Sequence, residues 1–337
     1  MSLRTFLPSL AFLACTSLIP APLLAETPLE HAQRALDQPT NLEFVDTPVK
    51  DVIAYLANQH RVPIRVLQET YDSGYVLQDQ PLTRNLSGLT LRSALNLMLD
   101  DLDLDYCVTD RGEILIFAAD KKFPPQRPVS CAQAAAAERL RQVLEKKIVS
   151  LEFVDTPLKD VVAFLADEID VTMVLDLQAL DALRLEPDAP VTKNLQKMPL
   201  RRALTAFLYP YDLGVTLRDE VFYITHRDPR TPRLPIPDDL KRAALAPVAI
   251  ELVDPPLREA LILCADQADV TIVWDHRRVE RLGITPDTQV VGPLPKMPLR
   301  DVLQKILTPL GLRAVVIDEV LFITPMVNKN EKGRVTP

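Results

Sequence analysis

Histidine binds metals and transfers protons near neutral pH, so the four histidines of this 337-residue chain are the first candidates for chemistry. They are His31, His60, His226 and His276. No two of them have the i, i+4 spacing that places a pair of ligands on one helix face. The sequence therefore predicts neither a metal site nor an acid–base pair built on histidine.

Aspartates at two sets of positions are the next candidates. Asp46, Asp155 and Asp254 occupy matching places just before a predicted helix, where a carboxylate can accept hydrogen bonds from free N–H groups. We expect them, with Thr156 in the second case, to cap helices; catalysis would need two carboxylates converging in a cleft, for which the sequence offers no evidence. Asp176 and Asp275 each end a predicted strand and are expected to form turns. Calcium binding is the alternative for this pair, but the alternating oxygen ligands of a calcium loop are missing.

The cysteines and the single tryptophan favour structural roles. Cys107, Cys131 and Cys264 have the spacing of neither a disulfide framework nor a zinc site. Cys264 falls on an apolar helix face and is predicted to be buried, and Cys107 lies in a strand that is partly exposed. Cys131 begins a linker helix and is the cysteine best placed to react or to form an intermolecular disulfide. Trp274 is expected in a core.

Motifs for nucleotide and acyl chemistry are absent. The chain has 8 glycines and no phosphate-binding loop, no nucleophile elbow and no G-x-x-G loop of a KH-type RNA module. A net charge of −8 makes binding to nucleic acid or to anionic membranes unfavourable. We therefore predict a chain that is not an enzyme and has no catalytic, cofactor-binding or metal-binding residues.

Residues 1–25 have the pattern of a secretory signal peptide. Arg4 supplies the positive start, residues 6–19 are almost entirely apolar or small, and Ala25 precedes the expected cleavage point. A retained membrane anchor and lipidation at Cys15 are the alternatives. Export to the periplasm or another extracytoplasmic compartment is the expectation, and removal of Arg4 takes the net charge from −8 to −9.

The strongest signal is an internal repeat. The sequence from Leu42 to Pro48 recurs at 151–157 and, more loosely, at 250–256. The offsets are 109 and 99 residues, and both hold without gaps over long stretches. A gapless match of that length predicts three copies of one module.

The repeat divides the chain into modules and linkers. The modules are predicted at residues 41–119, 148–227 and 248–326, each long enough for a modest core of its own. A linker helix is predicted at 26–40, and Pro-rich linkers with a helix are predicted at 120–147 and 228–247. A charged, disordered tail is predicted at 327–337.

Each module is predicted to be α+β. In the second copy, β-branched residues at 149–154 and 171–175 predict strands, and apolar residues from Leu158 to Leu165 have helical spacing. A third strand at 191–195, a second helix after Pro199 and a hairpin at 214–225 complete the order β-α-β-β-α-β-β. We expect two helices packed on one face of a mixed sheet.

With these elements placed, the modules resemble the short N-terminal domain of secretins and TonB-dependent receptors. The matching features are the strand and helix around Pro157-Leu158, the strand that ends at Asp176, the helix start at Pro199 and the hairpin. The first copy departs from the pattern, with Leu67 where the others have aspartate and with a longer turn at 110–113. The resemblance implies a periplasmic docking unit without a pore or receptor barrel.

The expected function is a non-catalytic interaction or scaffold protein of the cell envelope. Its partners would be envelope proteins, or further copies of itself, bound through sheet edges. Two alternatives stay open: a binder of a small ligand, or an enzyme, that uses a cleft between modules, and a self-associating structural component.

Overall fold

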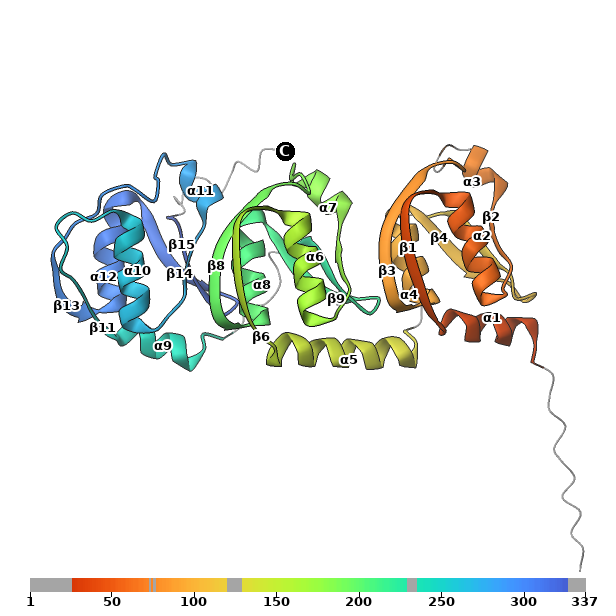
Figure 1. The fold of residues 1–337 in the computed structure, drawn as a ribbon, viewed down its shortest axis with the longest axis horizontal. Helices are drawn as coiled ribbons and strands as arrows, with labels where there is room; N and C mark the ends of the chain where they lie inside the picture. The colour runs from red at the N-terminus through yellow and green to blue at the C-terminus, as the bar shows by residue number, and fades with distance from the viewer. Residues whose placement is uncertain (1–25, 73, 75–76, 120–128, 229–234, 327–337) are drawn as a thin grey trace, which may run out of the picture.

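The computed structural model describes residues 26–72, 74, 77–119, 129–228 and 235–326. Within them, three similar modules follow one another in a row, each preceded by a helix (Figure 1). The predicted signal peptide, with Cys15, and the predicted tail at 327–337 lie outside the described residues.

The element order predicted for one module is found three times. Each module also has a short helix after its second strand. The first module contains β1 (Pro39–Pro48), α2 (Val49–His60), β2 (Ile64–Val66), α3 (Gln68–Asp72), β3 (Pro81–Thr90), α4 (Leu91–Asp100), β4 (Leu104–Val108) and β5 (Ile114–Ala118). The second contains β6 (Ile148–Pro157), α6 (Leu158–Ile169), β7 (Met173–Leu175), α7 (Leu177–Ala182), β8 (Pro190–Pro199), α8 (Leu200–Leu208), β9 (Leu213–Arg218) and β10 (Val221–His226). The third contains β11 (Pro247–Ile250), α10 (Leu257–Ala268), β12 (Ile272–Trp274), α11 (His276–Glu280), β13 (Leu294–Pro298), α12 (Leu299–Leu307), β14 (Leu312–Ile317) and β15 (Val320–Pro325).

The linker helices are α1 (Pro28–Leu36), α5 (Cys131–Lys146) and α9 (Asp238–Leu245). Helix α5 is twice as long as α9, because Pro235 and Pro237 stand where residues would extend α9 at its start. Among the described residues, no helix is long and apolar enough to cross a membrane.

The five strands of a module divide between two sheets, where we had expected one. In the second module, β6 and β8 form an antiparallel pair, and β7, β10 and β9 form a mixed sheet in that order. Strand β7 is parallel to β10, and β9 is antiparallel to it. The sequence pattern predicts each strand but does not say which strands pair.

The predicted apolar faces form the core of each module. In α6, Leu158, Val161 and Leu165 are fully buried. In α8, Leu200, Ala203 and Phe207 are equally buried. Cys264 is fully buried at the α10 position that matches Leu165, and burial raises the pKa of its thiol to about 12, so the predicted core cysteine is confirmed.

The prediction that the repeated aspartates cap helices is wrong. Helix α6 begins after Pro157 with no side-chain cap, and Thr156 instead donates a hydrogen bond to the carbonyl of Val154. Asp155 lies at the irregularity in the pairing of β6 with β8 and has a φ of +50°. Asp46 and Asp254 have the same left-handed backbone, which aspartate tolerates better than most residues.

Capping belongs instead to the aspartates that end the second strands. Asp176 accepts a hydrogen bond from the amide of Ala179 at the start of α7, and it also accepts one from Thr225. Asp275 accepts from the amide of Arg278 at the start of α11. The turn predicted at these two positions is therefore a helix cap.

These two environments predict opposite responses to glycine. Asp155→Gly removes a side chain from a left-handed backbone, so the free energy of unfolding should stay the same or rise. Asp176→Gly loses the bond from Thr225 and the cap, and should lower that free energy by about 1 kcal/mol. Denaturant unfolding of both variants tests this. Equal losses at the two positions would contradict the assignment.

Candidate docking surfaces between the modules

Each module after the first inserts its last hairpin against the module that precedes it. The hairpin β9–β10 reaches the first module, and β14–β15 reaches the second (Figure 1). We call these the docking hairpins. We call the surface that each one contacts, at the start of α4 or α8 and around it, the receiving face.

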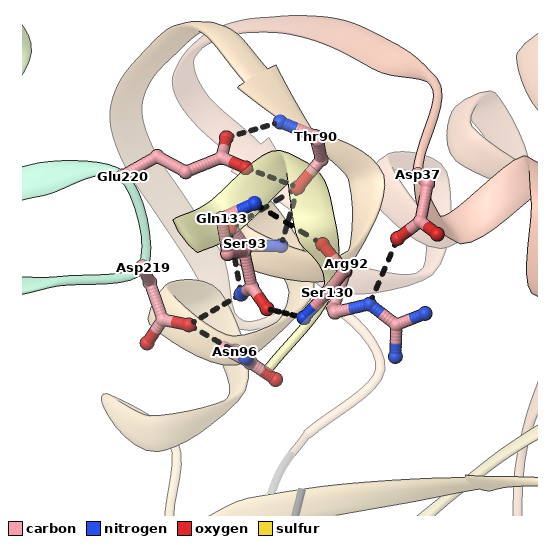
Figure 2. Close-up of polar contacts among 9 residues, drawn as sticks. All are labelled: Asp37, Thr90, Arg92, Ser93, Asn96, Ser130, Gln133, Asp219 and Glu220. Carbon is pink, nitrogen blue, oxygen red and sulfur yellow. Dashed lines mark hydrogen bonds and ion pairs between the residues drawn. The ribbon is translucent and has the colours of Figure 1, made fainter. Parts of the chain in front are cut away.

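The turn of the first docking hairpin binds the N-terminus of α4 (Figure 2). The carboxylate of Glu220 accepts hydrogen bonds from the Thr90 amide at 2.8 Å and from the Thr90 hydroxyl at 3.1 Å. Asp219 accepts a bond from the Asn96 side chain at 2.7 Å. Glu220 therefore places a negative charge at the positive end of the helix dipole, where anions are stabilised, and Asp219 binds the same helix further along.

Helix α5 joins the same cluster from below the hairpin. The Gln133 side chain donates to Ser93 at 3.0 Å and to Asp219 at 3.2 Å (Figure 2). Ser130 caps α5 and shares reciprocal hydrogen bonds with Gln133, which fixes the position of that side chain. One glutamine thus links the linker helix to both modules.

Apolar side chains of the hairpin sheet complete the first junction. Val174, Val221 and Tyr223 of the second module belong to the hydrophobic core of the first, and none is more than 8% exposed. Burial raises the pKa of Tyr223 to about 12. Full burial of side chains of this size is worth about 1.5–3 kcal/mol each before ordering costs are subtracted.

The second junction uses equivalent positions. Val273, Val320 and Phe322 follow Val174, Val221 and Tyr223 by the repeat offset of 99, and all three pack into the core of the second module. Phe322 lies with its ring centroid 4.6 Å from that of Tyr209.

In this junction the acidic turn is bound by ion pairs, not by the N-terminus of a helix. Asp318 pairs with Arg227 at 3.2 Å, and Glu319 pairs with Arg202 at 3.4 Å. Arg202 stands at the position of Ser93 in the first module. The two receiving faces therefore bind the acidic turn at matching positions, the first with hydrogen bonds at a helix start and the second with ion pairs.

The second junction also holds a lysine with an unusual environment. The Lys193 ammonium donates to the carbonyl of Trp274 at 3.0 Å. Burial lowers the pKa of Lys193 to about 8, and the charge of nearby Asp275 only partly opposes this. Asp275 is itself fully buried and paired with Arg278 at 2.7 Å, and Arg278 also pairs with Asp212.

The histidines are spread over the chain. His276 begins α11 and packs edge-on against Tyr211 at the second junction, where burial lowers its pKa. His60 is partly buried, its Nε2 has no hydrogen-bond partner, and burial lowers its pKa too. His31 and His226 are exposed. Within the described ranges, no three metal-binding side chains gather into a possible site.

The remaining candidates lie as follows. Cys107 is exposed on β4, and Cys131 is exposed as the first residue of α5, as predicted. The reactivity of Cys131 stays a prediction. Trp274 is partly buried beside the core of the third module, and its carbonyl belongs to the second junction.

Sequence reasoning missed the four acidic turn residues, Asp219, Glu220, Asp318 and Glu319. A signal was present, because the Asp-Glu turn is shared by the second and third copies and is altered to Asp110-Arg111 in the first copy. A charged turn shared by the two copies that follow another copy indicates contact with the module before it.

A cleft of about 710 Å³ opens between the first two modules. Its polar lining includes Asn85 and Ser87 of the first module and Asp167, Asp170 and Glu220 of the second, with Arg139 from α5. Three carboxylates against one guanidinium give this cleft an acidic character.

Comparison with known proteins finds no family model, no curated protein and no solved structure that matches this chain.

The first junction makes a direct prediction. Replacing Asp219 and Glu220 together by alanine removes the anions at the start of α4, and charged hydrogen bonds of this kind are worth about 1.5–3 kcal/mol each. We expect hydrogen exchange at the Thr90 amide to become faster by an order of magnitude or more. Asp110→Ala, at the matching but exposed turn of the first module, is the control. Equal exchange rates in both variants would show that the turn does not hold the junction.

The second junction should respond to alkaline pH. The pKa of Lys193 is about 8 in the folded protein and near its ordinary value of 10.5 when unfolded, so between these values the unfolded chain binds more protons. The contribution of Lys193 to the free energy of unfolding therefore rises with pH between about 8 and 10.5, and it is lost again as the pH falls to 8. Lys193→Met should flatten the rise, measured by denaturant unfolding followed through Trp274, the only tryptophan. Lys305→Met, an exposed control, should keep it, and an unchanged slope in Lys193→Met would refute the assignment.

Proposed function

We propose that this chain is a non-catalytic interaction or scaffold protein of the cell envelope, in which three docking modules are held in one row. The support is of two kinds. The sequence begins with the pattern of an export signal and resembles periplasmic docking domains, and the docked hairpins hold successive modules in similar relative positions.

The observation that carries this proposal is a set of exposed apolar residues that recur at matched positions of the modules. Val45, Val154 and Val253 are each 73–75% exposed. In the first two modules the following helix also exposes an aromatic residue, Tyr55 at 45% and Phe164 at 50%. In the third module the matching residue is Leu263, which is partly exposed.

The helices that carry or follow these residues, α2, α6 and α10, lie on the near side of their modules in Figure 1. Each aromatic residue is held by an edge-on contact with a second ring, Phe44 for Tyr55 and Phe153 for Phe164. Exposed apolar groups held in place and repeated are typical of protein interaction sites. Three linked copies of a weak site add avidity if the partner is also repeated or extended.

The acidic cleft between the first two modules favours a second candidate function, the binding of a small cationic ligand. Its polar lining distinguishes it from the apolar pockets that usually enclose a small molecule. Glu220, which lines the cleft, is already bonded to Thr90 and contributes to the first junction.

Site-specific photocrosslinking of the tagged full-length chain in its native cells tests the first proposal. A photoreactive residue at Phe164 should capture a defined envelope protein, and one at exposed Arg184 on the same module should not. Capture should fall when Val45, Val154 and Val253 are all changed to lysine, which leaves the cores intact because these side chains are exposed.

Other outcomes choose between the alternatives. Crosslinks only between copies of the chain would make it a self-associating structural component. An absence of crosslinks at Phe164, together with a thermal shift caused by a small polyamine, would favour the ligand binder.

A further inference from the structure

The third module has a groove formed only by residues of its own and of the linker helix before it. The groove lies between α9, α12 and the hairpin β14–β15, and its volume is about 340 Å³. Apolar side chains make up most of its lining, among them Leu240, Ala243, Leu303, Leu307, Ala314 and Leu321. Sites for small molecules in proteins have volumes of about 300–1,000 Å³, so this groove is large enough for a small one.

Two arginines also line the groove, and none of the described residues in its lining is acidic. Arg300 lies near the start of α12, Arg313 lies on β14, and both are exposed. Arg300 pairs with Asp301 at 3.3 Å, but these side chains are 63% and 43% exposed, and exposed ion pairs are weak. A guanidinium has five N–H donors, so Arg300 can bind a second anion.

The matching groove of the second module holds its arginine differently. Its volume is about 250 Å³, and Arg201, the counterpart of Arg300, pairs with Glu145 of the linker helix α5 at 3.3 Å. The first module has a similar pair, in which Arg92 bonds to Asp37 at the end of α1 at 3.1 Å. In both modules, a carboxylate from the end of the linker helix neutralises the arginine near the start of the module's second long helix.

Three replacements distinguish the groove of the third module from that of the second. They are Ala244 for Glu145, Arg313 for Gly214 and Thr308 for Tyr209. The first removes the carboxylate of the linker helix, the second adds a cation, and the third exchanges an aromatic ring for a smaller side chain. Together they give an apolar groove with two exposed arginines and no acidic residue of the linker helix to neutralise them.

We propose that this groove binds an amphipathic anion, namely a single alkyl chain that ends in a carboxylate, as in a free fatty acid. The chain would lie against the apolar side chains of α9, α12 and the hairpin. The carboxylate would accept hydrogen bonds from the guanidinium groups of Arg300 and Arg313, whose planar donors match carboxylate geometry. The small volume favours one alkyl chain over the two of a membrane phospholipid. This inference goes beyond the proposed function and does not depend on it.

Titration calorimetry of the full chain with decanoate, below its micelle concentration, tests the proposal. We expect saturable binding, with an affinity that falls about fourfold for each methylene removed, as octanoate would show. Decanol, which has the same chain without the charge, should bind about fivefold more weakly. An absence of saturable decanoate binding, or equal affinities for decanoate and decanol, would overturn the proposal.

The replacement that distinguishes the modules also serves to locate the site. Ala244→Glu restores the carboxylate of the second module beside Arg300 and should weaken decanoate binding about tenfold. Ala244 is partly exposed on a surface helix, so the fold tolerates this change, which circular dichroism verifies. Lys305→Gln, at an exposed residue of α12 outside the lining, should leave the affinity unchanged. Equal decanoate affinities in the Ala244→Glu variant and the unchanged chain would contradict the assignment.

Vesicles of phosphatidylglycerol distinguish a free ligand from a lipid that stays in a bilayer. The full chain should not use this groove to bind them, so Ala244→Glu should leave its flotation with the vesicles unchanged. Flotation that Ala244→Glu abolishes would assign the groove to a membrane lipid and would overturn the proposal of a free carboxylate.

Discussion

Burial of one module's hairpin in the core of the module before it is the interaction on which the row depends. Val221 and Val320 are almost fully buried, yet each lies at the edge of its own module and is covered by the neighbour. Such residues would be exposed in an isolated module, and the cost of exposing them favours the docked arrangement. The acidic turns fix the register of the hairpin on the receiving face, because their carboxylates must meet a helix start or two arginines.

Much of the fold could be predicted because it depends on local periodicity. The apolar spacing in α6 and α8 and the β-branched runs of the strands placed the elements of each module. The repeat strengthened these predictions, since an alignment of three copies identifies core positions that one copy leaves ambiguous. Cys264 is an example, because its match to Leu56 and Leu165 predicted the burial that the structure has.

What could not be predicted depends on contacts between distant residues. Asp155 precedes a helix in the sequence, but a bulge in the pairing of β6 with β8 sets its backbone and leaves the helix without a side-chain cap. The division of five strands into two sheets has the same origin. The environment of Lys193 depends on Trp274 and Asp275 of the next module, about 80 residues away, and no local pattern indicates that.

The differences between copies carry information that the consensus does not. In the second and third modules, whose hairpins dock, Val174 and Val221 and their matches Val273 and Val320 are apolar and the turn is acidic. In the first module the same positions hold the ion pair of Arg65 and Glu113. The third module differs on α12, where Lys305 is exposed at the place of Ala206, which is fully buried in the second module. The consensus of the copies therefore marks the shared core, and the departures from it mark the surfaces at which the contacts of one module differ from those of the next.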